Sequence, residues 1–188
     1  MSSGRQQGNW IIRIAGLICI LTVIFIIFQT QLHRLKSDSP LPLKVSAELR
    51  TLALKALESE DVPVAALVLY REEIIGRGYN TVYKDHNVAG HGEINAVNDA
   101  AGSMGMEAFM KLDRKELYLI STFEPCEMCK GTLNHYGIRN VGFLKDKSLF
   151  QWIKSYGRSV RYEMLKRQTE GEPLQDSLFL LHPRYPGR

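Results

Sequence analysis

The sequence Phe123-Glu124-Pro125-Cys126-Glu127-Met128-Cys129 contains two cysteines three positions apart, directly after a proline that suits the first turn of a helix. Residues at this spacing lie on one face of a helix, so both sulfur atoms can reach the same metal ion. A catalytic zinc ion takes three protein ligands and leaves its fourth position open for water. The two cysteines therefore predict a metal site that needs one further protein ligand.

The segment His91-Gly92-Glu93 offers that ligand, because zinc accepts a histidine nitrogen together with thiolates. Glu93 would then lie beside the metal without binding it. From there its carboxylate can take a proton from a metal-bound water and return it to a leaving amine. The sequence predicts a Zn²⁺ cofactor held by His91, Cys126 and Cys129, with Glu93 as the catalytic residue.

The composition limits the classes of protein to which the chain can belong. With 188 residues, of which 45% are hydrophobic, the chain is long enough for one domain of ordinary size and a short additional segment. Its formal net charge is +4, and Arg5 and Arg13 account for part of this surplus near the N-terminus. In the rest of the chain, basic and acidic residues are nearly equal in number. This weakens the case for a polynucleotide substrate, because nucleic-acid-binding proteins usually carry a strong basic excess. Three cysteines are too few for a disulfide framework.

An apolar segment near the N-terminus predicts a membrane anchor. Residues 14–28 carry no charge, and a helix that starts at Asn9 is long enough for the ~30 Å hydrocarbon core of a bilayer. The rival interpretation, a cleaved signal peptide, lacks the small residues that cleavage requires. We expect a single-pass membrane protein whose catalytic domain is cytoplasmic, since thiolate ligands and a nucleotide substrate both fit that compartment. The predicted segments are a tail (1–8), a transmembrane helix (9–28), a linker (29–43) and a catalytic domain (44–188).

Strand and helix patterns alternate through the predicted catalytic domain, which is typical of the α/β class. We expect a three-layer α/β/α sandwich around a mixed five-stranded sheet, with parallel pairs in its second half. The predicted strands are residues 62–70, 74–79, 117–121, 140–144 and 160–165. The predicted helices are residues 44–60, 91–101, the cysteine helix that ends near Gly137, 149–156 and 174–181.

With this order of elements, residues 44–165 resemble the cytidine and deoxycytidylate deaminase-like superfamily. His-x-Glu followed by Pro-Cys-x-x-Cys is the signature of its zinc-dependent members. Residues 63–68, 78–80 and 124–131 are similar to the corresponding segments of bacterial guanine deaminases and tRNA adenosine deaminases. The resemblance implies a sandwich of the cytidine deaminase-like type, the three zinc ligands and the proton shuttle named above. It also implies a substrate contact at Asn80 and assembly as a homodimer.

One position departs from the family pattern. The family usually has alanine between the histidine and the glutamate, whereas this chain has Gly92. The missing methyl group would loosen the floor of the pocket or make room for a different ring. The departure therefore bears on the identity of the substrate more than on the chemistry.

The sequence thus predicts a zinc-dependent hydrolytic deaminase that releases ammonia from a nucleobase, nucleoside or nucleotide, with a purine favoured. Deamination of adenosine in tRNA is the alternative activity, and it would require RNA contacts from a basic cluster near the C-terminus. This cluster also fits a solvated face or contact with an anionic membrane surface. It consists of Lys154, Arg158, Arg161, Lys166 and Arg167.

Other interpretations of the motifs remain open at this point. Cys-x-x-Cys alone also fits a thioredoxin-like redox pair. A closed structural zinc site would need a fourth ligand, for which His86 is a better candidate than His135. Asn80 also fits an ordinary turn residue after a strand. The non-enzymatic interpretation is a zinc-stabilised membrane adaptor, but an adaptor has no need of Glu93 beside the metal.

Overall fold

The computed structural model describes Trp10, residues 13–26, residues 41–166, Leu178 and Leu181. The chain divides into two units, Met1–Pro42 and Leu43–Arg188. In the first unit, residues 13–26 form a helix whose large hydrophobic side chains, such as Leu17 and Phe25, are exposed.

The described part of the first unit corrects the prediction of a membrane anchor. No helix in the described part of the chain is both long enough and apolar enough to cross a membrane. The prediction of a single-pass membrane protein anchored through residues 9–28 is therefore wrong. Positions 9, 11–12 and 27–28 of that span lie outside the described residues.

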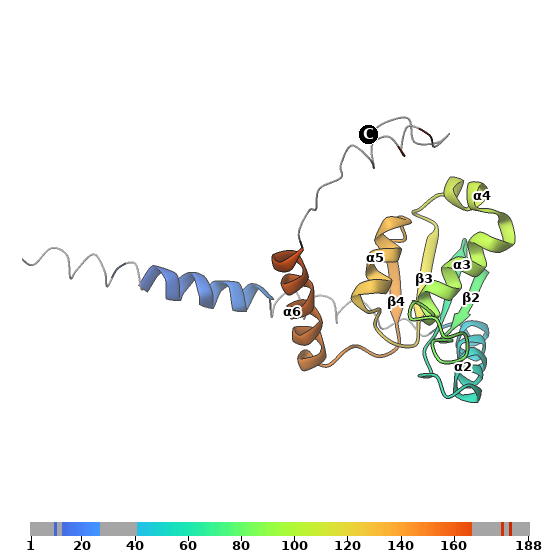
Figure 1. The fold of residues 1–188 in the computed structure, drawn as a ribbon, viewed down its shortest axis with the longest axis horizontal. Helices are drawn as coiled ribbons and strands as arrows, with labels where there is room; N and C mark the ends of the chain where they lie inside the picture. Colours follow the sequence, from blue (N-terminus) through green and yellow to red (C-terminus); the bar gives the residue numbers. More distant parts are fainter. Residues whose placement is uncertain (1–9, 11–12, 27–40, 167–177, 179–180, 182–188) are drawn as a thin grey trace, which may run out of the picture. The chain divides into compact units, whose positions relative to one another are not determined.

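The second unit is built on a mixed sheet with strand order β2-β1-β3-β4 (Figure 1). β1 (Ala65–Tyr70) pairs antiparallel with β2 (Glu73–Tyr79) on one side and with β3 (Leu117–Ser121) on the other. β4 (Asn140–Phe143) pairs parallel with β3, so the predicted mixed sheet is confirmed. The central position of β1 agrees with its almost unbroken apolar sequence, since a strand covered on both faces needs no alternation with polar residues.

Helices cover both faces of this sheet. On one face, α3 (Gly92–Met104), α4 (Met106–Lys111) and α5 (Glu127–His135) enclose the main hydrophobic core. Its buried residues include Ala66, Val68, Ala96, Val97, Ala100, Phe109, Leu117, Leu119 and Leu133. Side chains alternate along β1, so Leu67 points to the other face, where α2 (Leu43–Glu58) packs. This arrangement places α3 and α5 together on one side of the sheet.

The predicted fifth strand over residues 160–165 is not formed in the described residues, because these positions continue α6 (Leu149–Leu165). Ser148 starts this helix with a capping box: its side chain accepts from the backbone N–H of Gln151, and Gln151 Oε1 accepts from the N–H of Ser148. Helix propagation from this cap outweighs the strand preference of Val160 and Tyr162. The predicted helix over 174–181 lies outside the described residues, apart from Leu178 and Leu181.

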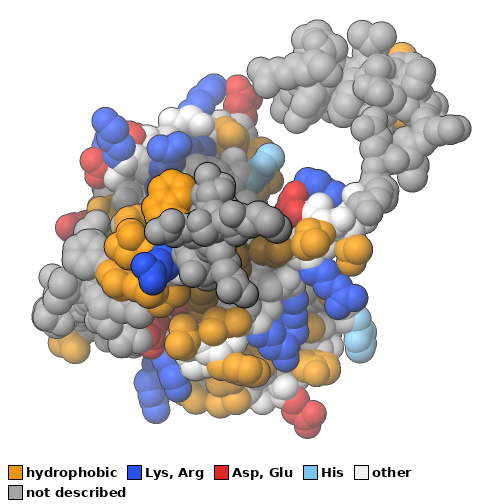
Figure 2. All heavy atoms as spheres, turned by 90° about the vertical axis from the view of Figure 1, so that its left-hand side faces the viewer, with side chains coloured by type: hydrophobic (Ala, Val, Ile, Leu, Met, Phe, Trp, Pro, Cys, Tyr) orange, Lys and Arg blue, Asp and Glu red, His pale blue; other side chains and the backbone are white. Residues whose placement is uncertain are grey.

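No residue of α6 is buried, and large side chains such as Phe150 and Met164 are exposed. Figure 2 shows one face of the molecule, on which hydrophobic side chains lie next to lysine and arginine side chains.

α3 approaches β2 unusually closely at two glycines that face the same side of the strand. A Cβ atom on Gly76 would meet Ala96 and Ala100, and a Cβ atom on Gly78 would meet the backbone of Gly92 and Ala96. The start of α3, which carries His91 and Glu93, is therefore held directly against the sheet.

We predict that Gly78→Ala lowers the free energy of unfolding by about 1–3 kcal/mol, because α3 must move to admit the methyl group. Gly102→Ala in α3 is the matched control, since no atom lies within 4 Å of its added Cβ. The control should leave stability unchanged or raise it by up to about 1 kcal/mol, because alanine is the better helix former. Urea denaturation of the two variants and the wild type measures both effects, and equal stability of all three would contradict the close-packing argument.

Candidate metal centre

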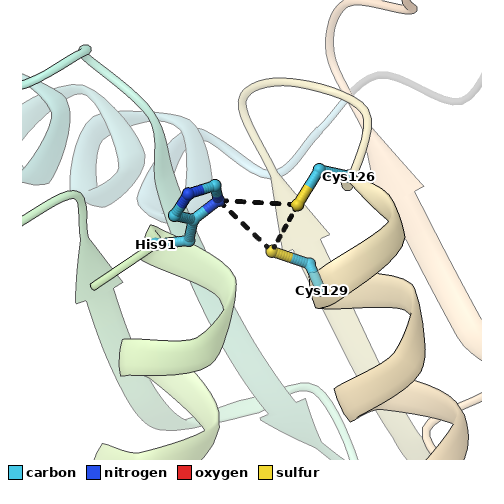
Figure 3. Close-up of side chains that lie close together, drawn as sticks. All are labelled: His91, Cys126 and Cys129. Atoms are coloured by element: carbon cyan, nitrogen blue, oxygen red, sulfur yellow. Dashed lines mark hydrogen bonds between the residues drawn. The ribbon is translucent and has the colours of Figure 1, made fainter. Parts of the chain in front are cut away.

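The N-terminal ends of α3 and α5 bring three of the predicted site residues together (Figure 3). His91 is the N-cap residue of α3, Cys126 is the N-cap residue of α5, and Cys129 lies in the first turn of α5. The distance from His91 Nδ1 to each cysteine Sγ is 3.6 Å, and the two Sγ atoms are 3.4 Å apart. Neither N-cap side chain caps its own helix, so both point toward the shared site.

These distances suit a zinc ion. Tetrahedral zinc with Zn–S of about 2.3 Å and Zn–N of about 2.05 Å separates nitrogen from sulfur by about 3.6 Å and the two sulfurs by about 3.8 Å. The observed separations therefore need only a small adjustment to hold the ion. In the part of the chain that the structure describes, His91, Cys126 and Cys129 form the one such group of potential metal ligands.

A closed structural site with a histidine as fourth ligand is not observed. His86 and His135 are exposed and lie outside the ligand group formed by the described residues. His91, Cys126 and Cys129 thus supply three protein ligands, which is the number found at catalytic zinc sites with an open position.

The pKa values of the two cysteines are shifted in opposite directions. Their mutual hydrogen bond lowers the pKa of Cys126 to about 5, while that same contact, together with burial, raises the pKa of Cys129. A divalent cation would favour the thiolate form of both cysteines, because a metal binds the deprotonated form of cysteine.

Glu93 is buried in the first turn of α3, on the side of the metal ligands. Cys129 Sγ lies 3.4 Å from Glu93 Oε2. Burial raises the pKa of Glu93, because a carboxylate loses the solvation that stabilises its charge. A raised pKa makes the carboxylate a stronger base, which is a property expected of a proton shuttle.

Asn80 follows β2 directly, and its side chain is buried next to the start of α3. Its Oδ1 accepts a hydrogen bond of 2.8 Å from the backbone N–H of Gly92. Asn80 is thus more than an ordinary turn residue, because its side chain satisfies a backbone donor of the first helical turn. Within the described residues, Asn80 Nδ2 makes no hydrogen bond and can serve a bound molecule.

The residues that hold Asn80 in place were not identified from the sequence. Asn95 Nδ2 donates to the backbone oxygen of Tyr79 at 2.8 Å and to Thr81 Oγ1 at 3.0 Å. These bonds fix the backbone on both sides of Asn80 from the second turn of α3. Only the helical position of Asn95, one turn after His91, could have indicated this role.

The structure gives Gly92 a packing role. A Cβ atom at this position would lie 2.8 Å from the carbonyl oxygen of Val64 and 3.3 Å from the Cα of Ala65. The added methyl group would therefore meet the backbone that leads into β1. The glycine is explained by the close approach of α3 to this segment, so the expectation of a looser pocket floor is not needed.

Comparison with known families supports the same chemistry. Residues 43–145 match the family described as the cytidine and deoxycytidylate deaminase zinc-binding region. The tRNA-specific adenosine deaminase 2 of Xenopus laevis is 31% identical over 117 residues, which cover 54% of this chain and 67% of that protein. The tRNA(Ile)-lysidine synthase of Deinococcus radiodurans is 39% identical over 85 residues, but the match spans 45% of this chain and only 14% of the synthase.

Two solved structures have a related fold. One comes from a study of A-to-I editing by tRNA:A34 deaminases at the wobble position of transfer RNA, with 25% sequence identity and a TM-score of 0.50. That match covers 55% of this chain and 76% of the other. The guanine deaminase of Bacillus subtilis is 21% identical with a TM-score of 0.55, and the match covers 74% of this chain and 98% of the other. At this identity the second likeness indicates the fold alone.

We predict that Gly92→Ala lowers the free energy of unfolding by about 1–3 kcal/mol and weakens zinc binding, because the methyl group would displace the turn that carries His91 and Glu93. Gly131→Ala in α5 is the matched control, since its added Cβ meets no atom within 4 Å. Denaturation with and without added zinc measures both quantities. Wild-type behaviour of Gly92→Ala would show that α3 has room for the methyl group.

Proposed function

The chain belongs to the cytidine and deoxycytidylate deaminase family. From this membership we propose that it hydrolyses the bond between a purine ring carbon and its amino group, at a zinc site formed by His91, Cys126 and Cys129. It is a hydrolytic deaminase with a zinc cofactor, as the family and the related adenosine deaminases establish. The adaptor interpretation is therefore not retained. The observation that carries the proposed site is the convergence of one histidine nitrogen and two cysteine sulfurs within 3.6 Å of one another.

The proposed reaction replaces the amino group of the ring by oxygen and releases ammonia. When bound, zinc supplies a water whose pKa falls from about 15.7 to about 7. As a C–O bond forms at the ring carbon, Glu93 takes the proton that the attacking water loses. The C–N bond then breaks after Glu93 has passed this proton to the amine. Burial of Glu93 favours the first transfer, because a raised pKa makes its carboxylate a stronger base.

We propose that Asn80 orients the ring. Its Oδ1 is held by the backbone N–H of Gly92, so the direction of the side-chain amide is set before a ligand arrives. Nδ2 then donates to a ring acceptor of the purine. Because Gly92 lies between His91 and Glu93, the same helical turn would fix the metal ligand, the proton shuttle and the substrate contact relative to one another.

We propose adenosine in a tRNA loop as the favoured substrate. The support is the 31% identity to a tRNA-specific adenosine deaminase 2 over two thirds of that protein. The base would have to be presented unpaired, because a base inside a duplex cannot reach a metal site at the start of two helices.

A free purine base or nucleoside is the second candidate. It is favoured by the modest net charge of +4, since proteins that bind a polynucleotide usually show a stronger basic excess. A homodimer is also part of the proposal and rests on the resemblance alone.

We predict that Glu93→Gln retains zinc and lowers the rate of deamination at least about 100-fold, because the amide cannot shuttle a proton. Zinc content and ammonia release, measured on the same preparation, test this role. Glu107→Gln is the matched control, because Glu107 is exposed and pairs with Lys111 on the surface of α4. Ammonia release by Glu93→Gln at the wild-type rate would exclude the assigned role.

The substrate is tested with a panel of tRNA transcripts that carry adenosine in the anticodon loop, together with adenosine, adenine, guanine and cytidine. We expect inosine in the tRNA and a binding affinity that falls steeply as salt is raised. Release of ammonia from guanine or adenosine alone, with no inosine in tRNA, would favour the second candidate. Activity on cytidine alone would contradict the preference for a purine.

A further inference from the structure

The loop that follows β4, residues 145–148, is joined to the segment that precedes the first cysteine ligand. The backbone N–H of Glu124 donates to the carbonyl oxygen of Lys145 at 2.8 Å. In the opposite direction, the backbone N–H of Lys147 donates to Glu124 Oε2 at 2.9 Å. The ammonium group of Lys147 donates to the carbonyl oxygen of Pro125 at 2.6 Å. Three hydrogen bonds thus connect two segments that are about twenty residues apart in the sequence.

The last of these bonds acts on the peptide unit that leads into the metal site. The carbonyl of Pro125 and the backbone nitrogen of Cys126 belong to the same planar peptide, so holding this oxygen sets the direction from which the chain enters Cys126. Cys126 needs such support, because it occupies the N-cap position of α5 and its own side chain makes no capping bond. The sulfur of Cys126 points to the metal site, so contacts from other segments must fix the backbone around this residue.

The charges around this contact are balanced. The carboxylate of Glu124 is only 16% exposed and accepts from the backbone of Lys147 on one oxygen, while Lys130 lies 3.6 Å from the other. Lys130 also pairs with Glu127 at 3.3 Å in the first turn of α5. The ammonium group of Lys147 makes no ion pair with these acids and donates to the Pro125 carbonyl. The positive charge of Lys147 thus faces the backbone carbonyl that directly precedes Cys126.

We propose that Lys147 is a positioning residue for the zinc ligand Cys126, acting through the carbonyl oxygen of Pro125. The inference rests on the proposed ligand set, because it requires Cys126 to bind the metal. Groups that orient a metal ligand without touching the metal typically contribute about 10- to 100-fold to metal affinity. Lys147 lies outside the motifs that identify the site, and neither the histidine segment nor the cysteine segment contains it.

The test is the zinc affinity of Lys147→Met, which keeps most of the aliphatic stem and removes the donor. Competition with a chromophoric chelator should show zinc binding weakened by about 10- to 100-fold. Lys145→Met is the matched control: it removes an exposed charge in the same loop and keeps the backbone oxygen that accepts from Glu124. The control should bind zinc within about twofold of the wild type.

Two further measurements separate positioning from a general loss of structure. Lys147→Arg retains a cationic donor for the Pro125 carbonyl, so its zinc affinity should return to within about threefold of the wild type. The Co²⁺-loaded proteins should show thiolate-to-cobalt absorption that is altered in Lys147→Met and normal in Lys147→Arg. Thermal unfolding identifies any variant that is not folded at the temperature of the binding assay.

Each outcome bears on the inference. Wild-type zinc affinity of Lys147→Met, or equal weakening in Lys145→Met and Lys147→Met, would overturn it. Equal weakening in Lys147→Arg and Lys147→Met would also do so, because the arginine restores the donor. Failure of the ligand set itself is recognised separately: the wild type would then bind no zinc, or His91→Ala would bind it as tightly as the wild type.

Discussion

The position of the metal centre depends on the close contact between α3 and the sheet. At Gly76, Gly78 and Gly92 no side chain fits between the helix and the neighbouring backbone. This contact fixes the start of α3, and with it His91 and Glu93, relative to β1 and β2. The cysteines come from α5, which follows β3, and β3 is hydrogen-bonded to β1. The two halves of the site are therefore held in register by one central strand.

The elements that carry the site could be predicted from the sequence because their signals are local. The apolar run of β1 indicated a strand covered on both faces, and the two motifs indicated helix starts with metal ligands on one side. In the structure, His91, Cys126 and Cys129 lie close together. The predictions of the membrane anchor and the fifth strand were wrong because both rested on apolar composition, which alone specifies neither a membrane span nor the choice between helix and strand. Residues 160–165 instead continue α6, which begins with a capping box at Ser148.

Contacts that link distant segments gave no comparable signal. Asn95 fixes the backbone around Asn80, and Lys147 holds the peptide before Cys126, but both are polar residues with no periodic pattern around them. Gly92 is a further example, since its role depends on the position of Val64 in space. Sequence motifs identify groups that touch a metal, whereas the groups that aim those ligands become visible only when the backbone is in place.

The proposed metal ligand His91, the N–H of Gly92 that bonds to Asn80, and the acid Glu93 are consecutive in the chain, and the chemistry of the site depends on this short separation. The peptide N–H that Asn80 accepts belongs to Gly92, which directly joins His91 to Glu93. A ligand bound to Asn80 Nδ2 would therefore act on the same helical turn that aims the imidazole and the carboxylate. Movement of this turn is restricted further by the backbone of Val64, which leaves no space for a Cβ atom at Gly92. Close packing and a hydrogen bond thus hold the acid in a fixed position beside the metal ligands, which a proton shuttle requires because proton transfer depends steeply on the separation of donor and acceptor.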